Sequence, residues 1–258
     1  MINPLTGYWN NSGIAEGDTV LIHSSLARTL RFLATRGVKP EAGLVIESIL
    51  EQIGKDGTLI FPLFNFDFPE TKFFSIIDTP SQMGILSEFV RLNYEGVRTG
   101  HPIYSFYAIG QNSQEFEAID NVSGYGSDSP FAKIIQMKGK IAVIDLEDQN
   151  SMTTYHHVEE MMNVDYRFHK TFDGLYENRA GKSQLKSYTL FVRDIDQGVT
   201  TDINRMGEIL WNEGLYSGNR PGVANGMRTI FANQLFERTA REISEGRALD
   251  TLYSINKV

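Results

Sequence analysis

The chain has 258 residues, of which 41% are hydrophobic and 22% charged, and its formal net charge is −8 at pH 7. These values are typical of a soluble globular enzyme with a sizeable core, and the negative charge argues against nucleic-acid binding by bulk electrostatics. Cysteine is absent, which excludes disulfides, thiolate metal sites and a cysteine nucleophile. No apolar run approaches the roughly 20 residues of a membrane span, and the N-terminus lacks a signal-peptide pattern. We therefore expect a cytoplasmic protein without membrane partners.

Strand and helix patterns alternate along the chain. Strands are predicted at 18–22, 58–63, 104–109, 141–144 and 188–192. Helices are predicted at 41–53, 85–92, 130–137, 202–211 and 228–244. Such alternation predicts an α/β sheet flanked by helices. Because no linker or repeat interrupts the pattern, we expect one domain over residues 1–258.

The stretch "NSMTTYHHVEEMM" (150–162) places two histidines beside two glutamates. Adjacent helical residues point about 100° apart, so His156 and His157 cannot both face one small ion from a regular helix, and the HExxH spacing is missing. A metal-dependent hydrolase using these side chains remains an alternative. The run also suits an ordinary helix start, where acidic residues favour the helix dipole and Thr153 or Thr154 caps. Taken alone, it favours the helix start over a catalytic site.

Other segments change that interpretation. They are "HSSLART" (23–29), "GTLIFPLFNFDF" (57–68), "RTGHPIYSFYAIG" (98–110), "GYGSDSPFAKI" (124–134), "GKIAVIDL" (139–146) and "DYRFHKTF" (165–172). In this order, they and the histidine stretch resemble the aminoglycoside 3-N-acetyltransferase family of antibiotic N-acetyltransferases, over about residues 15 to 215. The resemblance implies an α/β fold with a mixed central sheet. It also implies acyl transfer from coenzyme A to an amino group, commonly on a sugar, with acyl-CoA as donor and no metal.

The resemblance also implies a catalytic group. A sugar ammonium must lose its proton before it can attack a thioester, and histidine suits that task. The family pattern fits residues 153–159, which makes His156 the general base and His157 a packed neighbour on the substrate side, or else the base itself. Asp194 is expected to orient the imidazole, and the Thr154 hydroxyl to donate to the oxyanion. Without cysteine, direct transfer in a ternary complex is the simplest route.

The coenzyme contacts expected from the resemblance follow the first strand and precede the third. They are Ser24, Ser25, Leu26, Arg98, Thr99 and His101, with Phe131 lining the same groove. Backbone N–H groups after the first strand suit the pantetheine arm or the pyrophosphate. Loop capping for the serines and core packing for His101 are the competing interpretations.

Acceptor contacts are expected at Asp67, Asp196 and Arg193. Arg193 repels a polycation but can grip a phosphate, and the aromatic stretch 64–74 can stack on a nucleobase. We therefore favour a nucleotide-linked amino sugar, such as a dTDP-amino sugar of surface polysaccharide synthesis, over an aminoglycoside antibiotic. The same phenylalanines also suit a homodimer contact, and a non-catalytic descendant that only binds coenzyme A is a further alternative.

Overall fold

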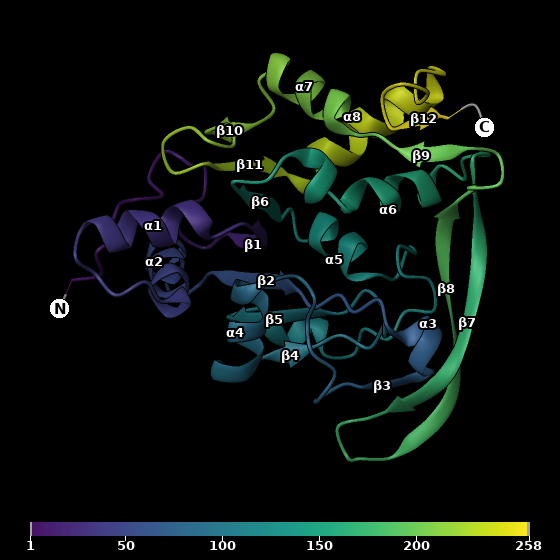
Figure 1. The fold of residues 1–258 in the computed structure, drawn as a ribbon, viewed down its shortest axis with the longest axis horizontal. Helices are drawn as coiled ribbons and strands as arrows, with labels where there is room; N and C mark the ends of the chain where they lie inside the picture. Colours follow the sequence, from purple (N-terminus) through teal and green to yellow (C-terminus); the bar gives the residue numbers. More distant parts are fainter. Residues whose placement is uncertain (1, 257–258) are drawn as a thin grey trace.

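The computed structural model describes residues 2–256 and has a central seven-stranded sheet with helices on both faces (Figure 1). The strand order is β10-β11-β6-β1-β2-β5-β4. The three central strands, β6 (Lys140–Ile144), β1 (Thr19–Ser24) and β2 (Thr58–Pro62), are parallel. Their neighbours on either side pair antiparallel. This arrangement confirms the predicted α/β fold with a mixed sheet.

The remaining elements complete the sheet, cover its faces or extend from its edge. The helices are α1 (Ala27–Thr35), α2 (Ala42–Ile53), α3 (Phe68–Thr71), α4 (Ile85–Asn93), α5 (Pro130–Gln136), α6 (Thr154–Met161), α7 (Asn204–Asn212) and α8 (Ala232–Ser244), with short 3₁₀ turns η1 (Ser113–Phe116) and η2 (Asp148–Asn150). The other strands are β3 (Phe73–Ser75), β4 (Val97–Arg98), β5 (Phe106–Gly110), β7 (Arg167–Glu177), β8 (Ser183–Arg193), β9 (Val199–Thr201), β10 (Ser217–Gly218), β11 (Met227–Phe231) and β12 (Tyr253–Ile255).

The central strands are apolar at consecutive positions because both sheet faces are covered. Along β1, Val20 and Ile22 join a buried cluster with residues of α1, α2 and α4. Leu21, between them, joins a second cluster with residues of α5, α6 and α8. Side chains alternate between faces along a strand, so each strand supplies both halves of the core.

A long hairpin of β7 and β8 stands at one side of the molecule (Figure 1). The two strands pair over eleven positions, and β3 adds a third strand next to β7. Several of its side chains face solvent, as in Phe168, which is 48% exposed. The hairpin closes one wall of the cavity described below.

Most predicted elements lie within one to four residues of the observed ones. One prediction was wrong in kind at its start: the predicted helix 228–244 begins with strand β11 before α8. Residues 167–177 form strand β7, which was not predicted. Helix α1 was also missed. Within residues 2–256, no helix has both the length and the apolarity to cross a bilayer. The single domain and the homodimer stay predictions.

Candidate active site

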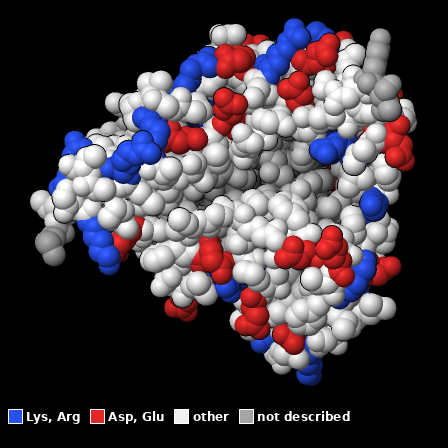
Figure 2. Space-filling model, viewed as in Figure 1, with Lys and Arg blue, Asp and Glu red and all other residues white. Residues whose placement is uncertain are grey.

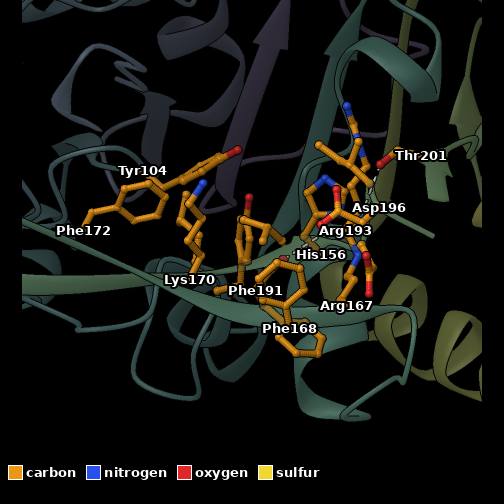
Figure 3. Close-up of a pocket in the computed structure, with 15 residues that line it drawn as sticks. Tyr104, His156, Arg167, Phe168, Lys170, Phe172, Phe191, Arg193, Asp196 and Thr201 are labelled. Atoms are coloured by element: carbon orange, nitrogen blue, oxygen red, sulfur yellow. Dashed lines mark hydrogen bonds between the residues drawn. The ribbon is translucent and has the colours of Figure 1, made fainter. Parts of the chain in front are cut away.

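A cavity of about 420 Å³ lies between helix α6 and the β7–β8 hairpin. Its apolar wall includes Tyr104, Tyr125, Phe168, Phe172 and Phe191, and its polar wall His156, Arg167, Lys170, Arg193, Asp194 and Asp196. Figure 3 shows Tyr104 and Phe172 on one side of it and His156, Arg167 and Thr201 on the other. Figure 2, viewed as Figure 1, shows a hollow across this face of the molecule, with basic side chains on its right rim and acidic ones along its lower rim. We call this space the large cavity.

His156 is fixed by two charged neighbours. Its Nδ1 lies 2.8 Å from Oε2 of Glu159, which is one helical turn further along α6. The Arg167 guanidinium approaches both groups, with Nε 2.8 Å from Glu159 Oε2 and Nη2 3.0 Å from His156 Nδ1. An ionised carboxylate only accepts hydrogen bonds, so Nδ1 carries the proton and donates to Glu159. The Arg167 contact with Nδ1 is then a close approach of two donors.

These neighbours also set the protonation of the pair. Burial lowers the pKa of His156, and the Arg167 charge lowers it further, against the opposing effect of Glu159. Burial raises the pKa of Glu159, but the Arg167 charge and the hydrogen bond from His156 outweigh it, so the net shift is downward. At neutral pH the pair is therefore a carboxylate and a neutral imidazole. With the proton on Nδ1, Nε2 has a free lone pair and can act as a base.

A second cavity of about 210 Å³ meets the large one at this histidine. Tyr104, His156 and Thr201 line both spaces. The remaining lining of the small cavity comes from the segment 149–153 before α6 and from Phe64, Phe66, Met83 and Ile203. His156 thus stands in a wall shared by the two cavities.

The predicted acceptor segment does line the large cavity, but its carboxylates have other partners than expected. Arg193, Asp194 and Asp196 all contribute to the wall. The Asp194 carboxylate accepts hydrogen bonds from the backbone and side chain of Gln197, at 3.2 and 2.7 Å. The structure therefore corrects the prediction that Asp194 orients His156, because Glu159 occupies that position.

The predicted coenzyme contacts at residues 98–101 lie in the core. Arg98 is 1% exposed and its guanidinium donates to Ser105 Oγ and to the carbonyl oxygens of Thr79, Ile76 and Leu63. Thr99 Oγ1 accepts from the Phe106 amide. His101 Nδ1 accepts from two amides, and burial lowers the pKa of this imidazole to about 4. These three side chains are structural, and the prediction that they grip the coenzyme is corrected.

The other predicted contacts are scattered. Ser24 ends β1, the Ser25 amide donates to the Ile144 carbonyl, and Leu26 is buried at the start of α1. Neither Phe131 nor Thr154 lines either cavity, and both are at most 2% exposed. The Thr154 hydroxyl has no hydrogen-bond partner among residues 2–256.

Two further predicted substrate contacts lie outside both cavities. His157 is 2% exposed, and its Nδ1 donates to the Tyr125 carbonyl at 2.6 Å, so it is a packed neighbour and not a cavity residue. Asp67 is exposed beside α3, outside both cavities. Within residues 2–256 there is no group of three or more metal-ligating side chains. The two histidines face different surroundings, which leaves the hydrolase alternative without geometric support.

Several residues of the site were given no role in the sequence analysis, although four of them lie inside a quoted motif. Glu159 follows the histidines in "TTYHHVEE", Arg167 and Lys170 belong to "DYRFHKTF", and Tyr104 to "RTGHPIYSFY". The signal for Glu159 was its spacing of three from His156, which places both on one helix face. The role of Arg167 depends on strand β7, which the sequence did not predict.

Three comparisons with known proteins bear on this site. A family model described as aminoglycoside 3-N-acetyltransferase matches residues 21–241. The SPbeta prophage-derived aminoglycoside N(3')-acetyltransferase-like protein YokD of Bacillus subtilis is 24% identical over 170 residues, which are 57% of this chain and 60% of that protein. The chain thus spans less than two thirds of that relative in the alignment.

Solved structures share the fold. AAC-IIIb in its binary complex with CoASH has a TM-score of 0.77 and 19% identity, covering 93% of this chain and 95% of that one. AAC-VIa bound to sisomicin has a TM-score of 0.76 and 19% identity, covering 93% and 96%. At such identities the likeness establishes the fold.

Proposed function

Because the chain belongs to the aminoglycoside 3-N-acetyltransferase family, we propose that it transfers the acyl group of an acyl-CoA to an amino group of an amino sugar. One observation carries the proposal: His156, held by the Glu159 carboxylate, stands in the wall shared by two cavities. A fold relative with bound CoASH and another with bound sisomicin support the donor and acceptor classes.

The reaction follows from the protonation of the pair. The ammonium of the acceptor first releases one proton to bulk water. The free amine then attacks the thioester carbonyl while Nε2 of His156 takes the second proton from nitrogen. Glu159, hydrogen-bonded to Nδ1, stabilises the imidazolium that forms. The tetrahedral intermediate then collapses, the carbon–sulfur bond breaks, and the imidazolium returns the proton to the coenzyme A thiolate. Each proton leaving nitrogen is thus accounted for, and no covalent enzyme intermediate is needed.

The two cavities suit the two substrates. The small cavity, with amide and hydroxyl groups of residues 149–153 beside Phe64 and Met83, matches the alternating amide and apolar units of a pantetheine arm. The large cavity has room and carboxylates for an amino sugar. An Asn150→Trp variant, which narrows the small cavity, should raise KM for acyl-CoA and leave KM for the amine unchanged. The reverse result would mean that the small cavity binds the amine and the large cavity binds acyl-CoA.

Aminoglycosides are the first acceptors to test. The family and the sisomicin-bound relative favour them, and Asp194 and Asp196 can hold ammonium groups at the cavity wall. The favoured sequence prediction, a nucleotide-linked amino sugar, stays a prediction and is now the second candidate. Lys170 and Arg193 in the same wall favour it, since neither belongs to an ion pair among residues 2–256 and both can receive phosphate.

The test is release of free thiol from acetyl-CoA and longer acyl-CoAs, with 2-deoxystreptamine antibiotics and a nucleotide-diphospho amino sugar as acceptors. We expect turnover with acetyl-CoA and the antibiotics, and an acetylated product of the corresponding mass. Faster turnover of the nucleotide sugar by kcat/KM would reverse the choice of acceptor. Coenzyme A binding without turnover of any amine would instead support a non-catalytic descendant of the family.

A further inference from the structure

Arg167 makes more contacts in the site than the chemical steps described above use. Its side chain is 5% exposed. Besides its contacts with His156 and Glu159, Nη1 donates to the Phe191 carbonyl at 3.1 Å and Nη2 lies 3.4 Å from Thr201 Oγ1. One buried guanidinium therefore bridges helix α6 and strands β8 and β9.

The last two contacts lie on either side of one loop. The loop Asp194–Gly198 connects β8 to β9, and we call it the acceptor loop because Asp194 and Asp196 line the large cavity. Phe191 precedes it and Thr201 follows it. Tyr166, which precedes Arg167, makes a third contact with this loop: its carbonyl accepts a hydrogen bond from the Asp194 amide at 3.1 Å. The start of β7 thus fixes the loop as well as the imidazole.

We propose that Arg167 is a positioning residue that ties the His156–Glu159 pair to both sides of the acceptor loop, and so sets the distance between the base and the amine. The inference rests on the proposed function. A planar guanidinium has donors in a rigid fork, so it can hold groups on several elements at once. Lysine, with one flexible ammonium, cannot make the same set of contacts.

The charge of Arg167 gives the proposal a spectroscopic signature. The charged groups around the His156 imidazole are Glu159 on α6, Arg167 on β7 and Arg193 on β8, with Lys170, Asp194 and Asp196 in the same cavity wall. The neutral ring of Tyr125 packs on it at 5.3 Å. A cation at this distance disfavours the imidazolium, so its removal must raise the imidazole pKa.

The first test needs no turnover, so it separates this inference from the proposed function. Histidine ring signals are followed by NMR against pH in the full-length protein, which has five histidines, and His156 is assigned by its loss in His156→Asn. Arg167→Met should raise the pKa of His156 by roughly one unit or more. Lys170→Met is the matched control, because it removes a cation from the same strand and cavity and should leave that pKa unchanged. An unchanged pKa in Arg167→Met would overturn the proposal.

The second test uses steady-state kinetics on a substrate that turns over. Arg167→Lys keeps the charge, so the acidic limb of kcat/KM should stay in place while KM for the amine rises about tenfold and KM for acyl-CoA does not. In Arg167→Met the limb should also move to higher pH. If Arg167→Met does not fold, Arg167→Lys alone decides. Equal rises in both KM values, or wild-type kinetics in Arg167→Lys, would show that Arg167 only stabilises the fold.

Discussion

Residues 98–101 and 193–196 were both predicted to contact a substrate, partly because each segment contains an arginine, but the first is buried and the second faces a cavity. Residues 98–101 are buried, and the Arg98 guanidinium makes four hydrogen bonds, to the Ser105 hydroxyl and to three carbonyl oxygens of the protein itself. Residues 193–196 line an open cavity, and Arg193 belongs to no ion pair among residues 2–256. A buried arginine with satisfied donors stabilises the fold, whereas a cavity arginine without a partner is available to a ligand. Charge in a motif therefore indicates a ligand contact only when the side chain reaches a cavity.

The largest effect should come from the histidine at the junction of the two cavities. His156→Asn should lower kcat about 10³-fold, equivalent to ~4 kcal/mol, because the general base is lost, with little change in acyl-CoA binding. Steady-state kinetics with the best acceptor measures this. His157→Asn is the control, since His157 is packed and its variant should lose activity only as far as it loses stability. A crippled His157→Asn beside a nearly normal His156→Asn would contradict the assignment.

Replacing the buried arginine tests the other half of the comparison. Arg98→Met leaves several carbonyl oxygens without donors, so the free energy of unfolding should fall by about 3 kcal/mol. Urea unfolding at pH 7 measures the loss. KM for acyl-CoA should not change in the protein that remains folded. A higher KM at unchanged stability would mean that Arg98 does contact the coenzyme.

His101 makes the same segment sensitive to acid. Its pKa is about 4 in the folded state and about 6.5 when unfolded. Between these values the unfolded state binds one more proton, so stability is complete above pH 6.5 and falls as pH drops towards 4. From pH 7 to 5 this histidine should account for a loss of about 2 kcal/mol. His101→Asn, which keeps an acceptor for the two amides, should show a smaller loss in urea unfolding at the two pH values. An identical loss in the variant would rule out this cause.

The smallest effect concerns acceptor choice at the cavity wall. Arg193→Met should raise kcat/KM for an aminoglycoside about fivefold, or ~1 kcal/mol, because a repelling charge is removed. Asp196→Asn should lower it by a similar factor. The effects should shrink in high salt, since ions screen them. Opposite signs in the two variants would favour an anionic acceptor such as a nucleotide-linked sugar.

The sequence predicted the covered sheet well because its strands are strongly apolar. The runs around Leu21, Ile60 and Val143 are buried on both faces, so their composition alone identifies them. Strand β7 was missed because a hairpin in solvent has no such constraint: Phe168, His169 and Lys170 are all exposed. The predicted helix 228–244 includes four of the five residues of β11, and this strand joins directly to α8, so no turn signal separates the two.

The site was harder to predict because its contacts are long-range. The pairing of His156 with Glu159 is local and follows from helical spacing. The approach of Arg167 depends on the unpredicted strand, and the distance of Asp194 from the imidazole depends on how the acceptor loop turns back onto Gln197. The burial of Arg98 is equally invisible in sequence, since an arginine before a strand looks the same whether it faces a phosphate or a carbonyl.

The central claim is acyl transfer with His156 as the base between two substrates. The most direct measurement is the mass of the acceptor after incubation of the wild-type protein with acetyl-CoA and an aminoglycoside such as sisomicin, followed by the same reaction with His156→Asn. We expect one added acetyl group with the wild-type protein, with one free thiol released per product, and almost none with the variant. Coenzyme A binding without any acetylated amine, or equal product from both proteins, would contradict the account.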